Sequence, residues 1–135
     1  MTTPAPDDGI LLTFPRGLLG FPQLKAFRLF EPSDGYPLKF LQAVDQPEIS
    51  FVCMDPAGIQ PDYTVPLADG EAEELAIQEP AEALILTLVV IPEDPRRMTT
   101  NLAGPLVVNT RTRTGLQVAL PSDRFPLKFP VFSGA

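Results

Sequence analysis

Among the side chains that commonly take part in catalysis, carboxylates are the most numerous in this chain. Twelve aspartates and glutamates lie between residues 40 and 95, and this window contains no lysine or arginine. A pair of carboxylates can perform general acid–base catalysis, but a charged side chain is far more often a solvated surface group. We therefore interpret the window as an acidic surface, which repels phosphate backbones and attracts basic proteins.

Other catalytic residue types are scarce. The chain has no histidine and a single cysteine, Cys53, which removes the commonest general base, the Ser–His and Cys–His nucleophile pairs and zinc sites built from Cys and His. The acidic residues do not follow the spacing of a calcium-binding loop. We predict no catalytic residue, no cofactor and no metal, and keep an enzyme with a carboxylate pair as the rival class.

The basic residues concentrate at the other end of the sequence. Six of the ten lie beyond residue 95 and accompany a single acid, Asp123. Cations spread so widely predict ion pairs with the acidic half of the fold rather than a nucleic-acid-binding patch. No apolar run approaches the ~20 residues of a membrane helix, and residues 1–9 lack the basic start of a signal peptide. We expect a soluble, cytoplasmic protein.

Short strands must position these charges. Runs of β-branched and aromatic residues, separated by many of the seventeen prolines, predict strands over residues 10–14, 26–30, 39–44, 49–53, 83–91, 106–110 and 116–120. The run 83–91 is apolar on both alternating faces, which predicts the central strand. Turns are predicted at Ser33-Asp34-Gly35 and at residues 111–115, where Gly115 can adopt a positive φ.

One segment favours a helix. Residues 69–78 are rich in helix formers, with Asp69 as the N-cap and three glutamates in the first turn. Leu75 and Ile77 are expected to pack it onto the core. The predicted fold is all-β, mainly antiparallel and barrel-like or a sandwich, with one short α-helix. It forms a single domain, residues 10–135, behind a flexible leader (1–9) and with a Pro/Phe-rich tail (124–135).

Three sequence blocks carry a resemblance to a known family. The first is FPRGLLGF at residues 14–21, followed by FRLF at 27–30; the second comprises KFLQAV at 39–44 and PEISFV at 47–52; the third is DP at 94–95 with MTTNLAGPLVVN at 98–109. Their order and spacing resemble the flagellar assembly factor FliW family. Ala43 stands where serine is more usual, and Gly104 where alanine is usual.

The resemblance implies a small, β-rich regulator without catalytic activity. Proteins of that family bind flagellin before export and, when flagellin is scarce, bind CsrA, a basic RNA-binding repressor of flagellin translation. The acidic window could meet the positive side of CsrA, since charge complementarity favours encounter and partner choice. No direct contact with nucleic acid or membrane is expected. The alternative is a β-barrel module that binds a small ligand or a non-flagellar peptide.

Six residues are candidate partner contacts. Glu93 and Asp94 follow the predicted central strand in an exposed loop, where binding groups often lie. Asn101 begins the next apolar segment. The tail places three aromatic residues among prolines, where they could anchor the tail or offer hot spots to a partner. These aromatic residues are Phe125, Phe129 and Phe132.

A structural role competes with several of these assignments. Asp94 precedes a proline and suits a cap or turn. Asn101 and Asn109 bracket a predicted strand, 102–108, and asparagine commonly closes turns by bonding nearby backbone. Gly17 and Gly20 are expected to serve a turn between the first two strands.

Overall fold

The structure is a computed structural model that describes residues 9–31 and 38–132. The predicted Ser33-Asp34-Gly35 turn, nearly all of the leader and the last three residues of the tail lie outside the described residues. Within the described ranges, no helix is long and apolar enough to cross a membrane.

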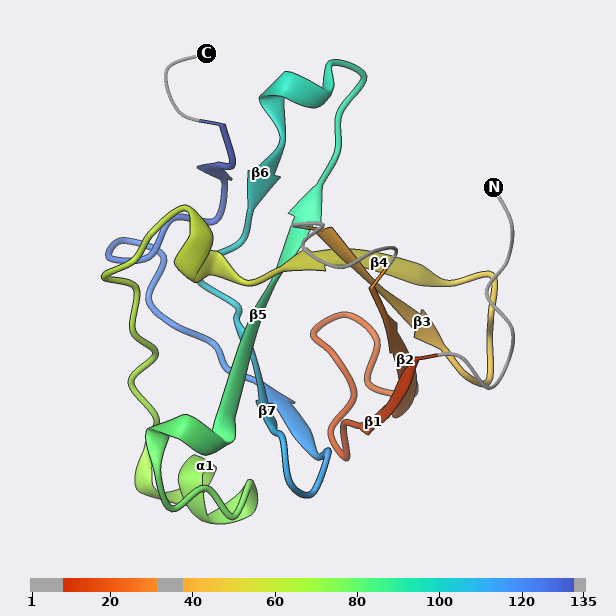
Figure 1. Ribbon diagram of the computed structural model, residues 1–135, viewed down its shortest axis with the longest axis vertical. Coiled ribbons are helices and arrows are strands. Elements are labelled where there is room, and N and C mark those ends of the chain that lie inside the picture. The colour runs from red at the N-terminus through yellow and green to blue at the C-terminus, as the bar shows by residue number, and fades with distance from the viewer. Residues whose placement is uncertain (1–8, 32–37, 133–135) are drawn as a thin grey trace.

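In the described ranges, nine strands and one short helix build the fold (Figure 1). All seven predicted strands are present, and every strand pair is antiparallel, which confirms the predicted fold class. The helix is α1 (Asp69–Glu74), and three single 3-10 turns are η1 (Pro56–Gly58), η2 (Pro80–Glu82) and η3 (Pro95–Arg97). The strands are β1 (Ile10–Thr13), β2 (Ala26–Phe30), β3 (Leu38–Ala43), β4 (Ser50–Met54), β5 (Ala83–Val90), β6 (Thr99–Thr100), β7 (Leu106–Asn109), β8 (Gly115–Gln117) and β9 (Phe129–Pro130).

Strand β5 is the junction of the sheet, as its two-sided apolar sequence predicts. Strands β1 to β5 follow one another in order, and the path continues through β6 to β9. The first half of β5, up to Leu86, pairs with β7, while Val89 and Val90 pair with β6. The sheet curls until Thr13 forms a single parallel bridge with Thr114. It is barrel-like in curvature, but no strand pair closes it.

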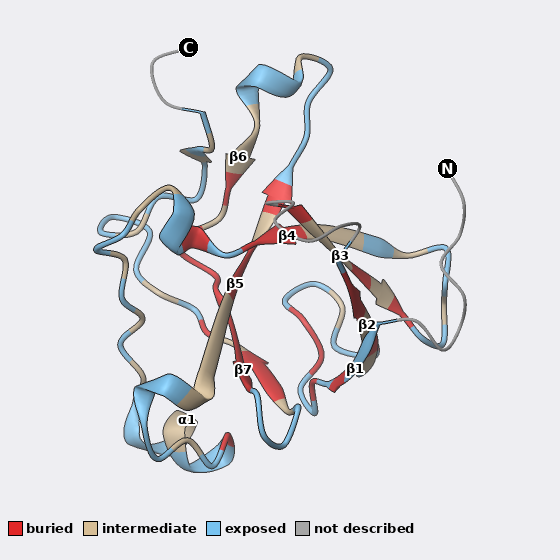
Figure 2. Cartoon of the chain, viewed as in Figure 1, coloured by how far each residue is buried: buried red, intermediate tan, exposed pale blue. Residues whose placement is uncertain are grey.

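The core fills the inside of this curl. Figure 2 shows buried residues on β2, β3, β4 and β7 and on the loop between β1 and β2. That loop contributes Leu18 and Leu24 to the core, and Phe14 packs edge-on against Phe27 with the ring centroids 5.7 Å apart. Burial of each such side chain stabilises the fold by roughly 1.5–3 kcal/mol.

A second cluster holds α1 against the sheet. Leu75 is buried with Val107, Leu116 and Val118, and Ile77 packs beside them. The predicted packing of Leu75 and Ile77 is therefore confirmed. Because this cluster includes β7 and β8, it fixes the acidic helix to the most buried strands of the fold.

The ends of α1 differ from the prediction. Ala68, not Asp69, is the N-cap, and the carboxylate of Glu71 accepts a hydrogen bond from the Ala68 N–H at 2.8 Å. The helix stops before residue 78 because Ala76 adopts a left-handed φ of 55°, and the Ile77 N–H then bonds back to the Ala72 carbonyl. This is a Schellman-type end, which usually uses glycine; alanine in its place gave no signal in the sequence.

The turn between β7 and β8 also differs. The left-handed residue is Arg113, with φ 62°, rather than Gly115. A Cβ at position 115 would lie 2.5 Å from the ring of Phe14, so glycine is needed there for close packing. The other glycine prediction is confirmed, because Gly17 and Gly20 have φ values of 68° and 85° between β1 and β2.

Candidate functional site

Two surfaces collect exposed charge, and they lie at opposite ends of the long axis of the molecule (Figure 1). We call the surface around α1 and η2 the acidic end; it comprises Asp69, Glu71, Glu73, Glu74 and Glu79. We call the other surface the hairpin end; it comprises the β5–β6 connection (residues 91–98), β9 with the two residues that follow it, and residues 58–60 of the loop after β4.

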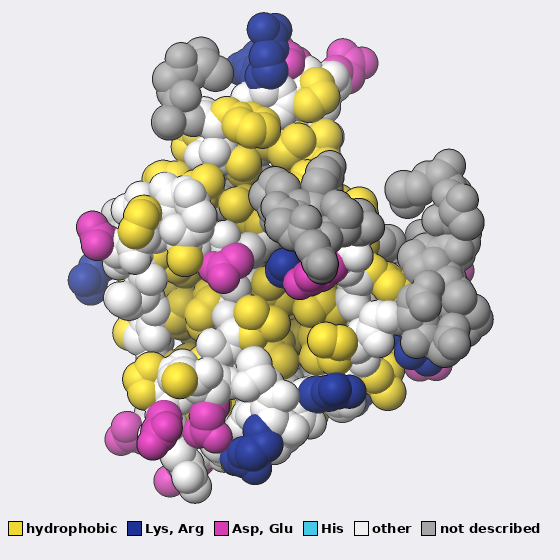
Figure 3. Space-filling model, viewed as in Figure 1, with side chains coloured by type: hydrophobic (Ala, Val, Ile, Leu, Met, Phe, Trp, Pro, Cys, Tyr) yellow, Lys and Arg dark blue, Asp and Glu magenta, His cyan; other side chains and the backbone are white. Residues whose placement is uncertain are grey.

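The acidic end remains negative after the ion pairs of the fold are formed. Glu74 is paired with Arg16. Among the residues that the structure describes, Asp69, Glu73 and Glu79 have no ion-pair partner. Figure 3 shows acidic side chains gathered over α1. A surface of this kind attracts a basic protein and repels phosphate.

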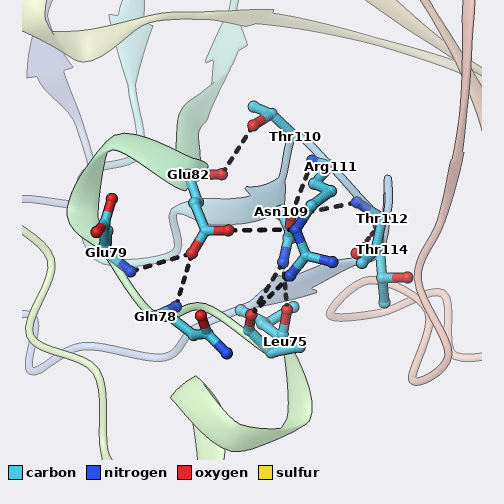
Figure 4. Close-up of polar contacts among 10 residues, drawn as sticks. Leu75, Gln78, Glu79, Glu82, Asn109, Thr110, Arg111, Thr112 and Thr114 are labelled. Atoms are coloured by element: carbon cyan, nitrogen blue, oxygen red, sulfur yellow. Dashed lines mark hydrogen bonds and ion pairs between the residues drawn. The ribbon is translucent and has the colours of Figure 1, made fainter.

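A hydrogen-bond network holds the acidic end against the sheet (Figure 4). The amide nitrogen of Asn109 donates to the Leu75 carbonyl at 2.8 Å, and its oxygen accepts from the backbone N–H of Arg111, also at 2.8 Å, and of Thr112 at 3.2 Å. Asn109 is completely buried. It therefore ties the end of α1 to the β7–β8 turn, as the structural interpretation predicts.

Glu82 joins the segment after α1 to the β7–β8 turn by a second set of hydrogen bonds. Its carboxylate accepts from the backbone N–H groups of Gln78 and Glu79, at 2.8 and 3.1 Å, and from Nε of Arg111 at 3.3 Å. These backbone hydrogen bonds, followed by that of Arg111, lower the pKa of Glu82. Glu82 thus stays ionised and serves the structure. Of the six basic residues beyond residue 95, Arg111 and Arg96 form ion pairs with the acidic window among the described residues, so the expected pairing of the two halves holds only in part.

The tip of the hairpin end is organised by Asp94. One carboxylate oxygen accepts from the Arg96 backbone N–H at 3.1 Å, and both oxygens accept from its guanidinium at 3.0 Å. The guanidinium, followed by the backbone bond, lowers the pKa of Asp94. The cap interpretation is confirmed, since Asp94 begins η3. Glu93 and Arg97, beside it, are exposed, and neither has an ion-pair partner within the described ranges.

An open groove of about 1140 Å³ runs beside this tip. Its polar lining includes Gln60, Arg96 and Arg97, and its apolar lining includes Ile59, Phe129 and Phe132. A second hollow shares Ile59 and Phe132 as a wall. Half of the surface of Phe132 is exposed. Figure 3 shows basic and acidic side chains side by side above an apolar area at this end of the molecule. We call this feature the hairpin groove.

The structure brings four of the six candidate contacts together. Glu93, Asp94, Phe129 and Phe132 all belong to the hairpin end. Asn101 instead closes a turn, because its side-chain oxygen accepts from the Ala103 N–H at 2.9 Å. The predicted strand at 102–108 begins only at residue 106, after this turn.

Phe125 is turned to the fold rather than to the groove. Its ring packs edge-on against Tyr63, with centroids 6.1 Å apart, and the Tyr63 hydroxyl donates to the Leu102 carbonyl at 2.7 Å. Burial raises the pKa of Tyr63 to about 12. Phe125 therefore anchors the start of the tail, while Phe129 and Phe132 face the groove.

Sequence reasoning missed three groove residues. Arg96 and Arg97 were visible as adjacent cations, but the sequence did not show that the tail returns to them. Ile59 comes from the loop after β4, and nothing in its local sequence indicates this position. In the part of the chain that the structure describes, no group of three or more His, Cys, Asp or Glu residues is placed to hold a metal ion.

Comparison with known proteins decides the family. A family model described as FliW protein matches residues 2–131. The chain belongs to the FliW family. The flagellar assembly factor FliW of Natranaerobius thermophilus is 36% identical over 124 residues, covering 91% of this chain and 82% of the relative. That of Moorella thermoacetica is 38% identical over 123 residues, covering 90% and 78%.

The fold agrees with a solved FliW structure. A crystal structure of the flagellar assembly factor FliW superimposes with a TM-score of 0.84 at 29% identity, covering 90% of this chain and 85% of that chain. The curled antiparallel sheet with one short helix is therefore the FliW fold. The family resemblance drawn from the three sequence blocks is confirmed.

Proposed function

We propose that this chain is a non-catalytic, cytoplasmic regulator of flagellar assembly that binds flagellin and sequesters the translational repressor CsrA. Membership of the FliW family supports the flagellar role. The two partners come from the family resemblance. The acidic end is the observation that carries the CsrA assignment, because CsrA is basic and binds RNA.

The acidic end suits a basic partner in two ways. Glu71, Glu73 and Glu79 carry negative charge without an ion-pair partner within the described ranges, which favours fast and selective encounter. Asn109 and Glu82 hold the segment in place before a partner arrives. Such preorganisation reduces the entropy cost of binding.

We assign the second surface to the second partner. Glu93, Asp94, Phe129 and Phe132 would contact flagellin at the hairpin end, with Asn101 and Phe125 positioning the segments that carry them. Surfaces at opposite ends do not compete for the same contacts. If flagellin limits CsrA binding, the two sites must be coupled through states of different affinity.

A module for a non-flagellar peptide is the alternative function. The hairpin groove is the observation that favours it, since exposed aromatic side chains beside arginines are typical of peptide-binding hot spots. Both functions make this chain a binding protein, and they differ in the identity of the partner.

Size-exclusion chromatography with light scattering tests the proposal. The chain is mixed separately with CsrA and with flagellin from the same organism. We expect a complex with each partner, and we expect salt to weaken the CsrA complex. Complex formation with flagellin alone would reduce the function to that of a chaperone. Complex formation with neither would refute the proposal and leave the peptide module.

A further inference from the structure

The hairpin groove is lined by arginines, although the chain as a whole is negative. The protein carries a formal net charge of −7. The described lining of the groove nevertheless contains two arginines and no acidic residue. Arg97 has no ion-pair partner among the described residues, whereas the guanidinium of Arg96, although exposed, is paired with Asp94. Guanidinium groups bind carboxylates in a bidentate geometry. The guanidinium of Arg97 is therefore available to a carboxylate of a partner in this groove.

The same groove offers apolar anchoring. Phe129 and Val131 are half-buried and Phe132 is exposed along its wall, while Val90 and Ile91 are exposed on the same hairpin. Large apolar side chains of a partner would remove this surface from water. Aromatic and arginine side chains together are the composition of interface hot spots.

Strand β9 is poorly suited to pair with a strand of a partner, so a partner at this groove would be recognised through side chains. Among the described residues, strand β9 pairs with β6 alone. Pro130 has no N–H to offer, and a strand of two residues is too short for a continuous ladder. A partner is therefore not expected to extend the sheet.

We infer that the hairpin groove binds a segment of a partner protein that carries carboxylates beside large aliphatic or aromatic side chains. The inference rests on the proposed function, which assigns a second partner to the hairpin end. It adds the chemistry of the segment by which that partner would be recognised. The two ends then select partners by opposite charge: a basic protein at α1 and an acidic, apolar segment at the groove. The acidic segment is repelled from α1.

Peptide selection tests this inference without any flagellar protein. A library of short random peptides is selected on the immobilised full chain, and enriched peptides are synthesised and measured by fluorescence anisotropy. The groove variants are Arg97→Glu and Phe132→Ala. The matched controls are Lys25→Glu, a charge reversal outside the groove, and Leu19→Ala, another exposed apolar residue. Urea unfolding checks that all four variants fold.

We expect enriched peptides that combine Asp or Glu with Leu, Ile or Phe. Each groove variant should weaken them by about tenfold, the size of a hot-spot contact, and the controls by less than about twofold. The inference is overturned if the peptides are basic or lack carboxylates, if both groove variants bind them as wild type does, or if no peptide is enriched. Such a result leaves the chromatographic test of the proposed function untouched, and failure of that test leaves this one standing.

Discussion

At the scale of single residues, Asn109 shows why a polar side chain belongs in this core. It is completely buried, yet both ends of its amide are hydrogen-bonded to backbone groups of other segments. The Leu75 carbonyl and the Arg111 N–H would otherwise lack these partners. A buried polar group left unpaired costs more than its hydrogen bond contributes.

Replacement of Asn109 by alanine should therefore destabilise the fold strongly. We expect Asn109→Ala to lower the free energy of unfolding by about 2–4 kcal/mol, since two or more backbone groups lose their partner. The control is Asn101→Ala, which removes one turn hydrogen bond and should cost about 1 kcal/mol. Urea denaturation measures both. Equal losses would contradict the role that we give to Asn109.

Cys53 is a residue of a reactive type whose burial makes it unreactive. It is fully buried in β4, and burial raises its pKa from 9.0 to about 12, against a smaller lowering by Lys39. The folded pKa lies above the unfolded one. The thiol therefore contributes stability below about pH 9, and this contribution is lost as the pH rises toward 12.

The thiol should accordingly resist modification in the folded protein. At about pH 8 we expect Ellman's reagent to react with Cys53 at least ~100-fold more slowly in the native chain than in urea, because the thiolate is rare and unexposed. Absorbance of the released thiolate reports the rate. Native labelling as fast as that of the unfolded chain would show that β4 does not bury this side chain.

At the scale of elements, the β6–β9 ribbon is the part of the sheet held by the fewest pairs. Two residue pairs join β6 to β5, and two join β9 to β6. The buried Thr100 hydroxyl reinforces the joint, because it hydrogen bonds to the Thr87 hydroxyl at 2.7 Å and to the Leu88 carbonyl at 2.9 Å. These pairings position β6 and β9, whose residues Thr99 and Phe129 line the hairpin groove.

Removal of this hydroxyl should loosen the ribbon selectively. We expect Thr100→Val to speed amide hydrogen exchange in β6 and β9 by about tenfold, which corresponds to a local loss of ~1.4 kcal/mol. Exchange in β2 and β3 should remain unchanged. Thr99→Val, on the half-buried neighbour, is the matched control. A uniform change over all strands, or none, would contradict the role of the joint.

The predictable elements are those whose pattern is local. The two-sided apolar run of β5 and the other six longer strands were predictable from composition and turn residues. Strands β6 and β9 were not, because two residues carry no period and they form only when the tail returns to the hairpin. The end of α1 at Ala76 was also unpredictable, since the left-handed residue is not glycine. The need for glycine at 115 depends on Phe14, about a hundred residues away.

At the scale of the whole molecule, the fold gathers part of the acidic window at one end of the long axis. The acidic window supplies α1 at one end of the long axis, while Glu93 and Asp94 of the same window lie with Arg96 and Arg97 at the other end. The sequence predicted an acidic surface, but none of the six candidate contacts lies at the acidic end. It predicted the hairpin end only in part, because Phe125 packs against Tyr63, Asn101 closes a turn and Ile59 joins the groove through tertiary contacts.

Calorimetric titration of CsrA into the chain, at low and at high salt, tests the proposed use of the acidic end most directly. One variant carries Glu71→Gln, Glu73→Gln and Glu79→Gln. The control carries Asp45→Asn, Glu48→Gln and Asp62→Asn, which removes the same charge from exposed positions elsewhere in the acidic window. We expect the first variant to bind CsrA about tenfold or more weakly at low salt, with a smaller salt dependence, and the control to bind within about twofold of wild type. Equal weakening by both variants, or by neither, would contradict the assignment of the acidic end to CsrA.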